Sequence, residues 1–127
     1  MLKLNYSDLG LSVEQFEGDL DRWIEHRVRL AMRAGMTLYT EAGRASFLIA
    51  IDHPLFDTLL AATAKITTIS VDIADAEYAE VVLQGTWLAE SIEACEGSLV
   101  CALGAQIEKV IDRLWVLDRS IHTGLRR

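Results

Sequence analysis

Hydrophobic residues recur with two different periods along the first part of the chain. Leu2, Leu4 and Tyr6 alternate with polar residues, and a second alternating stretch follows the turn at residues 7–10. A period of two is typical of β-strands, so these stretches predict an opening hairpin. Over residues 19–34 the apolar residues instead recur at steps of three and four, which predicts a helix.

Turn residues divide the middle of the chain. Residues 36–40 and 45–51 are β-rich runs on either side of a short glycine-containing connection, and this pattern predicts a second hairpin. Pro54 suits the first turn of a helix, for which Asp52 or His53 would be the cap. We therefore expect a second, shorter helix after Pro54.

The last part of the chain predicts one more hairpin and a long helix. Residues 66–73 and 79–87 alternate around a break that is typical of a turn. Residues 90–97 are acidic and loop-like. Ser98 is expected to cap a final helix whose apolar stripe continues to Ile121.

These elements follow one another in the order β-β-α-β-β-α-β-β-α, with hairpins and little sign of parallel crossovers. The order predicts the α+β class, with a single antiparallel sheet of about five to six strands and about two or three helices packed on it. We expect one domain over residues 1–121 and a frayed tail over residues 122–127.

Composition and charge narrow the classes of protein. The 127 residues are 51% hydrophobic and 24% charged, the balance of a globular domain, and no run has the length of a membrane span. The net charge of −7 repels phosphate backbones, which argues against nucleic-acid binding. Cys95 and Cys101 form no disulfide framework or metal motif, so a cytoplasmic location with reduced thiols is expected.

Arg27 is the most unusual residue of the first predicted helix. On a helical wheel its guanidinium falls within the apolar arc between Trp23 and Val28. A buried, unpaired charge is costly, so Arg27 needs a partner, an anionic ligand or a gap in the packing. Asp72 and Glu80 are candidate partners for it. The alternative is a structural arginine whose stem packs on the core while its head reaches solvent or joins a structural ion pair.

The other side of the same helix carries a basic stripe, which we define as Arg22, His26, Arg29 and Arg33. These residues are spaced at steps of four, three and four, so they share one side of a helix. In so acidic a chain the basic stripe is a candidate binding surface for an acidic partner. The alternative is an ordinary solvated face that nearby carboxylates partly neutralise.

The last predicted helix suggests self-association. Val100, Ile111, Trp115 and Val116 widen its apolar stripe beyond what a helix covering one sheet needs, so they are candidates for a homo-oligomer interface.

No catalytic, metal-binding or cofactor-binding motif is present in the sequence. The serines lack a nucleophile elbow, the glycines form no phosphate-binding loop, and Glu90, Glu93 and Glu96 lack the pattern of a calcium loop. The sequence therefore favours a non-enzymatic protein without a cofactor or metal.

Three apolar segments carry a resemblance to a known family. They are residues 45–52 (ASFLIAID), 84–89 (QGTWLA) and 96–103 (EGSLVCAL). In these segments, and over most of its length, the chain resembles an uncharacterised family of short cyanobacterial proteins. The resemblance implies a cyanobacterial cytosol and no assigned activity, cofactor or catalytic residue.

Two functions follow from these observations. The first is a non-enzymatic interaction or accessory protein that self-associates through the last helix and binds an acidic protein through the basic stripe. The second is a small-molecule or anion-binding domain whose pocket lies between the sheet and the first helix, with Arg27 in the pocket.

Overall fold

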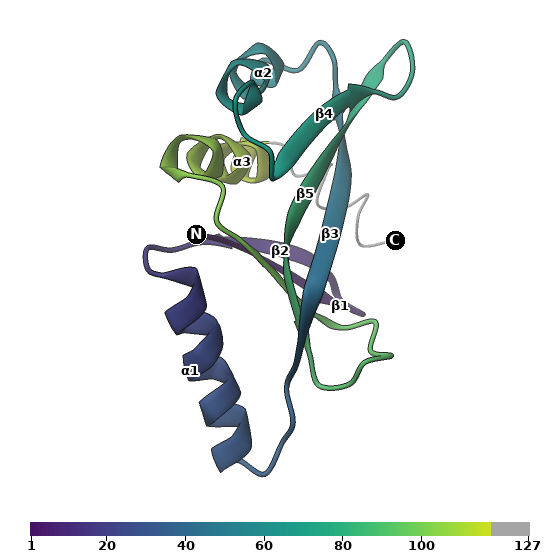
Figure 1. Cartoon of the computed structure of the whole chain (residues 1–127). Coiled ribbons are helices and arrows are strands. Elements are labelled where there is room, and N and C mark those ends of the chain that lie inside the picture. The colour runs from purple at the N-terminus through teal and green to yellow at the C-terminus, as the bar shows by residue number, and fades with distance from the viewer. Residues whose placement is uncertain (118–127) are drawn as a thin grey trace.

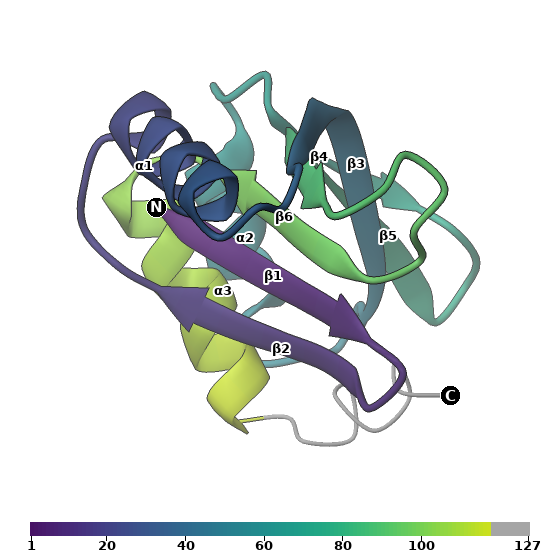
Figure 2. The same cartoon turned by 90° about the horizontal axis from the view of Figure 1, so that it is seen from below.

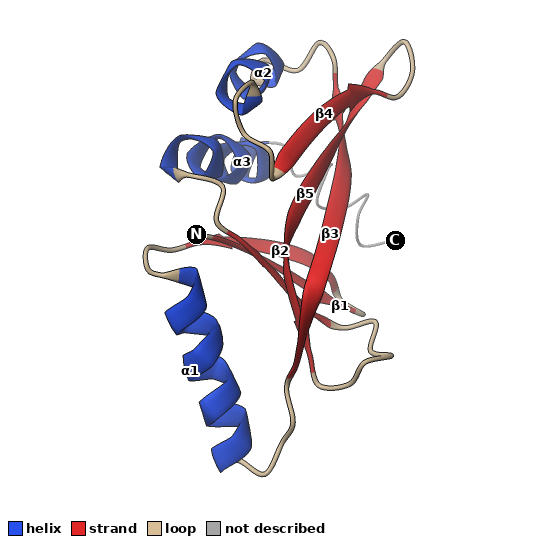
Figure 3. Cartoon of the chain, in the orientation of Figure 1, coloured by secondary structure: helices blue, strands red, loops and turns tan. Residues whose placement is uncertain are grey.

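The computed structural model describes residues 1–117, which form six strands and three helices (Figure 3). In chain order these are β1 (Leu2–Ser7), β2 (Gly10–Gln15), α1 (Leu20–Arg33), β3 (Tyr39–Ala50), α2 (Phe56–Thr63), β4 (Ile69–Ile73), β5 (Tyr78–Ala89), β6 (Gly97–Cys101) and α3 (Ala105–Leu117). The strands join one antiparallel sheet, so the predicted α+β class is confirmed. Ile121 and the predicted tail at residues 122–127 lie outside the described residues.

Strand β5 organises the sheet, whose order is β2-β1-β6-β5-β3 with β4 also paired to β5 (Figure 1). Along one side, β5 pairs with β3 over its full length. Along the other side, residues 79–83 of β5 pair with β4 and residues 86–88 pair with β6. The change of partner falls at Gly85, where an added Cβ would lie 2.3 Å from the carbonyl oxygen of Val100.

The helices lie on both faces of this sheet. Strands β1 and β2 cross between α3 on one side and α1 on the other (Figure 1), and Figure 2 shows α1 lying in front of the sheet when it is seen from below. The hydrophobic core lies on the face covered by α2 and α3. It includes Leu2 and Leu4 of β1, Val81 and Leu83 of β5, and Ile111 of α3.

The predicted hairpin over residues 36–51 is wrong, because this segment forms a single long strand, β3. Gly43 is not a turn residue. It lies opposite Gly85 in the register of β3 and β5, and a Cβ at Gly43 would be 3.0 Å from the Cβ of Trp87. The glycine is thus explained by the close approach of a neighbouring side chain within the sheet.

The predicted start of the last helix at Ser98 is also wrong. Ser98 lies in β6, which pairs with β1 and β5, and α3 begins only at Ala105, after Gly104 with its positive φ of 101°. Leu99, Val100 and Cys101 are all buried. A strand covered on both faces has no alternation, so its apolar run resembles that of a buried helix.

Candidate binding groove

A groove of about 1050 Å³ lies between α1 and the sheet face that α2 and α3 leave uncovered. Its floor comes from β1, β6 and the end of β5, one wall from α1 and the segment after it, and the other wall from the loop before β6. The lining residues are Lys3, Asn5, Tyr6, Trp23, Arg27, Leu30, Ala31, Ala34, Met36, Leu38, Leu88, Ala89, Glu90, Ser91, Ala94, Cys95, Glu96, Gly97 and Ser98.

The floor of the groove is polar because of the alternation along β1. Leu2 and Leu4 point into the core, so Lys3 and Asn5 point to the opposite face. The Oδ1 atom of Asn5 accepts a hydrogen bond from the hydroxyl of Ser98 on β6 at 2.7 Å. The Nδ2 atom of Asn5 donates to Ser12 on β2 at 3.4 Å. Side-chain hydrogen bonds thus cross three adjacent strands under the groove.

Two cations approach the ring of Trp23 where α1 borders the groove. The Nζ atom of Lys3 is 5.3 Å from the ring centroid and the Cζ atom of Arg27 is 5.1 Å from it. The ring of Trp23 also contacts that of Phe16, with ring centroids 5.5 Å apart. Cation–π contacts at such partly exposed sites contribute about 0.5–1 kcal/mol each. Trp23 therefore gathers positive charge at the groove.

Arg27 is exposed and lines the groove, so of the alternatives considered the structure shows a gap in the packing rather than a buried guanidinium. The reason is that α1 has no buried residue, and the groove leaves the side of the helix that carries Arg27 open. The two candidate partners, Asp72 and Glu80, lie opposite each other on β4 and β5, outside the groove. The structure thus brings Arg27 together with Trp23 and Lys3, and it does not bring it to either carboxylate.

The basic stripe lies on the outer side of α1. Successive helix residues turn by about 100°, which puts the half-buried Ile24 and Val28 on one side and the basic stripe on the other. All four residues of the basic stripe are exposed. Within it, the guanidinium of Arg29 forms an ion pair with Glu25, one helical turn earlier.

The wall opposite α1 is acidic. Glu90 and Glu96 line the groove, and Glu93 is exposed between them. The Oε1 atom of Glu96 also accepts a hydrogen bond from the backbone N–H of Asp8 at 3.2 Å, which connects this loop to the turn between β1 and β2. The two walls of the groove therefore carry charges of opposite sign.

Three of the four predicted interface residues are buried inside the chain, so the predicted interface at these three positions is wrong. Val100 lies in β6, and Ile111 and Trp115 lie on the core side of α3. The ring of Trp115 meets that of Phe47 edge-on, with centroids 4.7 Å apart. Helix α3 packs against α2 as well as the sheet, and this double contact explains its wide apolar stripe. Val116 is 64% exposed.

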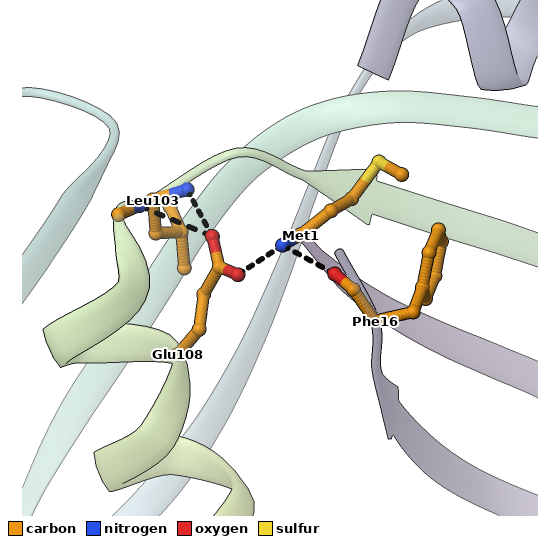
Figure 4. A network of polar contacts seen from close by, with 5 residues as sticks. Met1, Phe16, Leu103 and Glu108 are labelled. Carbon is orange, nitrogen blue, oxygen red and sulfur yellow. Dashed lines mark hydrogen bonds and ion pairs between the residues drawn. The ribbon is translucent and has the colours of Figure 1, made fainter. Parts of the chain in front are cut away.

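A buried ion pair that the sequence analysis missed lies at the start of α3 (Figure 4). The amino group of Met1 contacts Oε1 of Glu108 and donates to the carbonyl oxygen of Phe16 at 2.8 Å. The other oxygen, Oε2, accepts from the backbone N–H groups of Leu103 at 2.9 Å and Gly104 at 3.1 Å. A glutamate in the first turn of a helix after a glycine is the sequence signal for such a cap.

The two cysteines have different surroundings. Cys95 is exposed and lines the groove, whereas Cys101 is buried in the core. Burial, with a smaller contribution from the charge of Glu108, raises the pKa of the Cys101 thiol to about 12. Burial also raises the pKa of Tyr6 to about 12, with a smaller contribution from Cys101.

We expect a thiol reagent such as Ellman's reagent to modify only Cys95 in the native chain. The thiolate is the reactive form, and at about pH 8 a thiol with the pKa of Cys101 stays protonated. Mass spectrometry of the labelled chain checks this. Denaturation should release the second thiol, and Cys95→Ser should leave a native chain that does not react. Rapid labelling of Cys101 in the native chain would contradict its burial.

The groove offers several kinds of polar side chain that can contact a ligand. Its polar side chains are carboxylates, cations, an amide, hydroxyls and one thiol, and the residues that line it include no histidine. No group of three or more metal-ligating side chains occurs in residues 1–117. Over the same residues, no helix combines the length and apolar character that a membrane span requires.

Comparison with known proteins identifies the family of this chain. No curated protein and no solved structure matched it. Residues 1–119 match the family described as Alr0857-like. Since this match covers nearly all of the 127 residues, the chain belongs to the Alr0857-like family.

Proposed function

We propose that this protein is a non-enzymatic interaction protein that binds an acidic protein surface through α1. The observation that carries the proposal is that α1 has no buried residue along its 14 residues. An isolated helix of this length is only marginally stable in water, and most helices gain their stability by burying an apolar face. A partner that covers α1 would supply the burial that the single chain lacks.

Charge supports an acidic partner. Helix α1 carries four arginines and two carboxylates, a net charge of +2, in a chain whose net charge is −7. The rest of the chain therefore carries −9. Charge complementarity of this kind steers association and excludes partners of the wrong sign.

Apolar side chains beside the basic stripe support a protein partner over a small anion. Leu30, Met32 and Met36 are exposed, and Met32 reaches 68% exposure. Methionine adapts its shape to a partner, and methionines are common at binding surfaces. Leu30 and Met36 also line the groove, so one partner can contact α1 and the groove together.

A pull-down with a tagged chain tests this function. The test variant changes Arg22, Arg29 and Arg33 to glutamate. The matched control changes Lys65, Lys109 and Arg113 to glutamate, which alters the net charge equally at exposed positions away from α1. We expect a stoichiometric partner that the control retains and the α1 variant loses. Equal recovery with both variants would rule out α1 as the binding element.

A second candidate function is the binding of a small anion in the groove. It is favoured by the approach of Lys3 and Arg27 to the single ring of Trp23. A ligand stabilises the native state by mass action, so a thermal-shift screen of phosphates and carboxylates detects it. A rise in melting temperature that is absent in Arg27→Met would support this function, and no rise with any anion would exclude it.

A cytosolic location and a cyanobacterial origin are part of the proposal. The two cysteines are unpaired, as is typical of proteins in a reducing compartment. The origin is supported by the resemblance of three apolar segments, residues 45–52, 84–89 and 96–103, to a cyanobacterial family. The overall negative charge makes a nucleic acid an unfavourable partner.

A further inference from the structure

We infer that a second copy of this chain covers α1 and the groove, in a homodimer in which the α1 of each copy lies on the acidic loop of the other. We define the acidic loop as residues 90–96, with Glu90, Glu93 and Glu96. This inference rests on the proposed function, because it names the acidic surface that α1 binds.

The first argument is the opposite charge of the two walls. Helix α1 has a net charge of +2, and the acidic loop carries three exposed glutamates and no basic residue. A surface that holds both a positive and a negative wall is complementary to itself, which is the requirement for an interface between identical copies. A partner that is acidic throughout would instead be repelled by the acidic loop.

The second argument is geometric. The basic stripe lies on the side of α1 opposite the half-buried Ile24 and Val28, and it flanks the α1 residues that line the groove, such as Arg27 and Leu30. Two grooves can face each other around a two-fold axis parallel to their length. This rotation exchanges the walls, so that the α1 of one copy meets the acidic loop of the other at two equivalent contacts.

The third argument is the apolar surface along the groove. Leu30 and Met36 on the α1 side are exposed, and both line the groove. In the facing arrangement the equivalent apolar side chains of the two copies lie between the charged contacts. The interface would thus have an apolar centre and a charged rim, as protein interfaces commonly do.

The test is a charge exchange followed by sedimentation velocity at low salt. One variant changes Arg22, Arg29 and Arg33 to glutamate, which makes both walls acidic. The second variant changes Glu90 and Glu93 to lysine, which makes both walls basic overall, and keeps Glu96 because it bonds to Asp8. We expect the wild type to dimerise and each variant alone to dimerise at least about tenfold more weakly, because like charges then meet at both contacts.

Mixing the two variants should restore the dimer, because each acidic wall then meets a basic one. Recovery on mixing also shows that both variants are folded. A wild type that stays monomeric at all concentrations, or a mixture that stays monomeric, overturns the homodimer. If the homodimer fails but the α1 variant still loses a partner in the pull-down from lysate, a different acidic protein covers α1 and the proposed function stands. If the α1 variant loses no partner either, the homodimer and the proposed function both fail.

Discussion

Replacement of Glu108 by alanine is expected to lower the free energy of unfolding by about 3–5 kcal/mol, the usual cost of removing one partner from a buried ion pair. The Glu108 side chain is only 4% exposed, and its two oxygens accept from the Met1 amino group and from two backbone N–H groups before α3. In the variant these donors stay buried without their acceptor. Urea unfolding followed by circular dichroism measures the loss.

The matched control for Glu108 is Glu14→Ala. The carboxylate of Glu14 is 3.8 Å from the Nζ atom of Lys3 and 58% exposed, so its loss should cost no more than about 1 kcal/mol. Glu108→Gln keeps one carbonyl oxygen for the backbone N–H groups and removes the charge, so it should fall between the two. Equal stability of the Glu108→Ala and Glu14→Ala variants would mean that the buried ion pair does not form in solution.

Replacement of Gly85 by alanine is expected to lower the free energy of unfolding by about 3 kcal/mol or more, at the upper end of the cost of overpacking. The new Cβ would lie 2.3 Å from the carbonyl oxygen of Val100 and 2.7 Å from the Sγ atom of Cys101. Both belong to β6, and the carbonyl is backbone. The new Cβ can be accommodated only if β6 moves away from β5. Urea unfolding measures the resulting loss in the free energy of unfolding.

A second readout distinguishes a displaced strand from a general loss of stability. If β6 moves in the Gly85→Ala variant, Cys101 should become reactive toward thiol reagents under native conditions. The control, Gln84→Ala, changes the exposed neighbouring residue of the same strand and should leave both stability and labelling close to wild type. A Gly85→Ala variant as stable as this control would mean that β5 and β6 do not pair so closely.

The sequence predicted the elements that have one covered face. Strand β1 alternates because Leu2 and Leu4 face the core while the residues between them face away, and α1 shows the helical period with Asp19 as its N-cap. It could not predict β6, whose Leu99, Val100 and Cys101 are all buried and therefore show no alternation. Nor could it distinguish a turn glycine from Gly43, which lies within β3 because Trp87 approaches it. These features depend on neighbours that are distant in the sequence.

The candidate site was predicted only in part, for a related reason. Helical spacing identified the residues that share a side of α1, including the basic stripe, but it carries no information on what covers each side. It therefore left open whether Arg27 meets a partner, a ligand or a gap in the packing, and the structure shows a groove there. The same limit applies to α3, where Ile111 and Trp115 suggested an interface and in fact pack within the chain.

The position of β1 has a consequence for the synthesis of this protein. Strand β1 lies between β2 and β6, so one of its two neighbours is made from residues 97–101. Until those residues leave the ribosome, the nascent chain exposes an unpaired edge of β1, and the apolar Leu2 and Leu4 lack the helix that covers them. Exposed edges and apolar surface promote aggregation during synthesis. The growing chain therefore keeps this aggregation-prone surface exposed until β6 and α3 have formed.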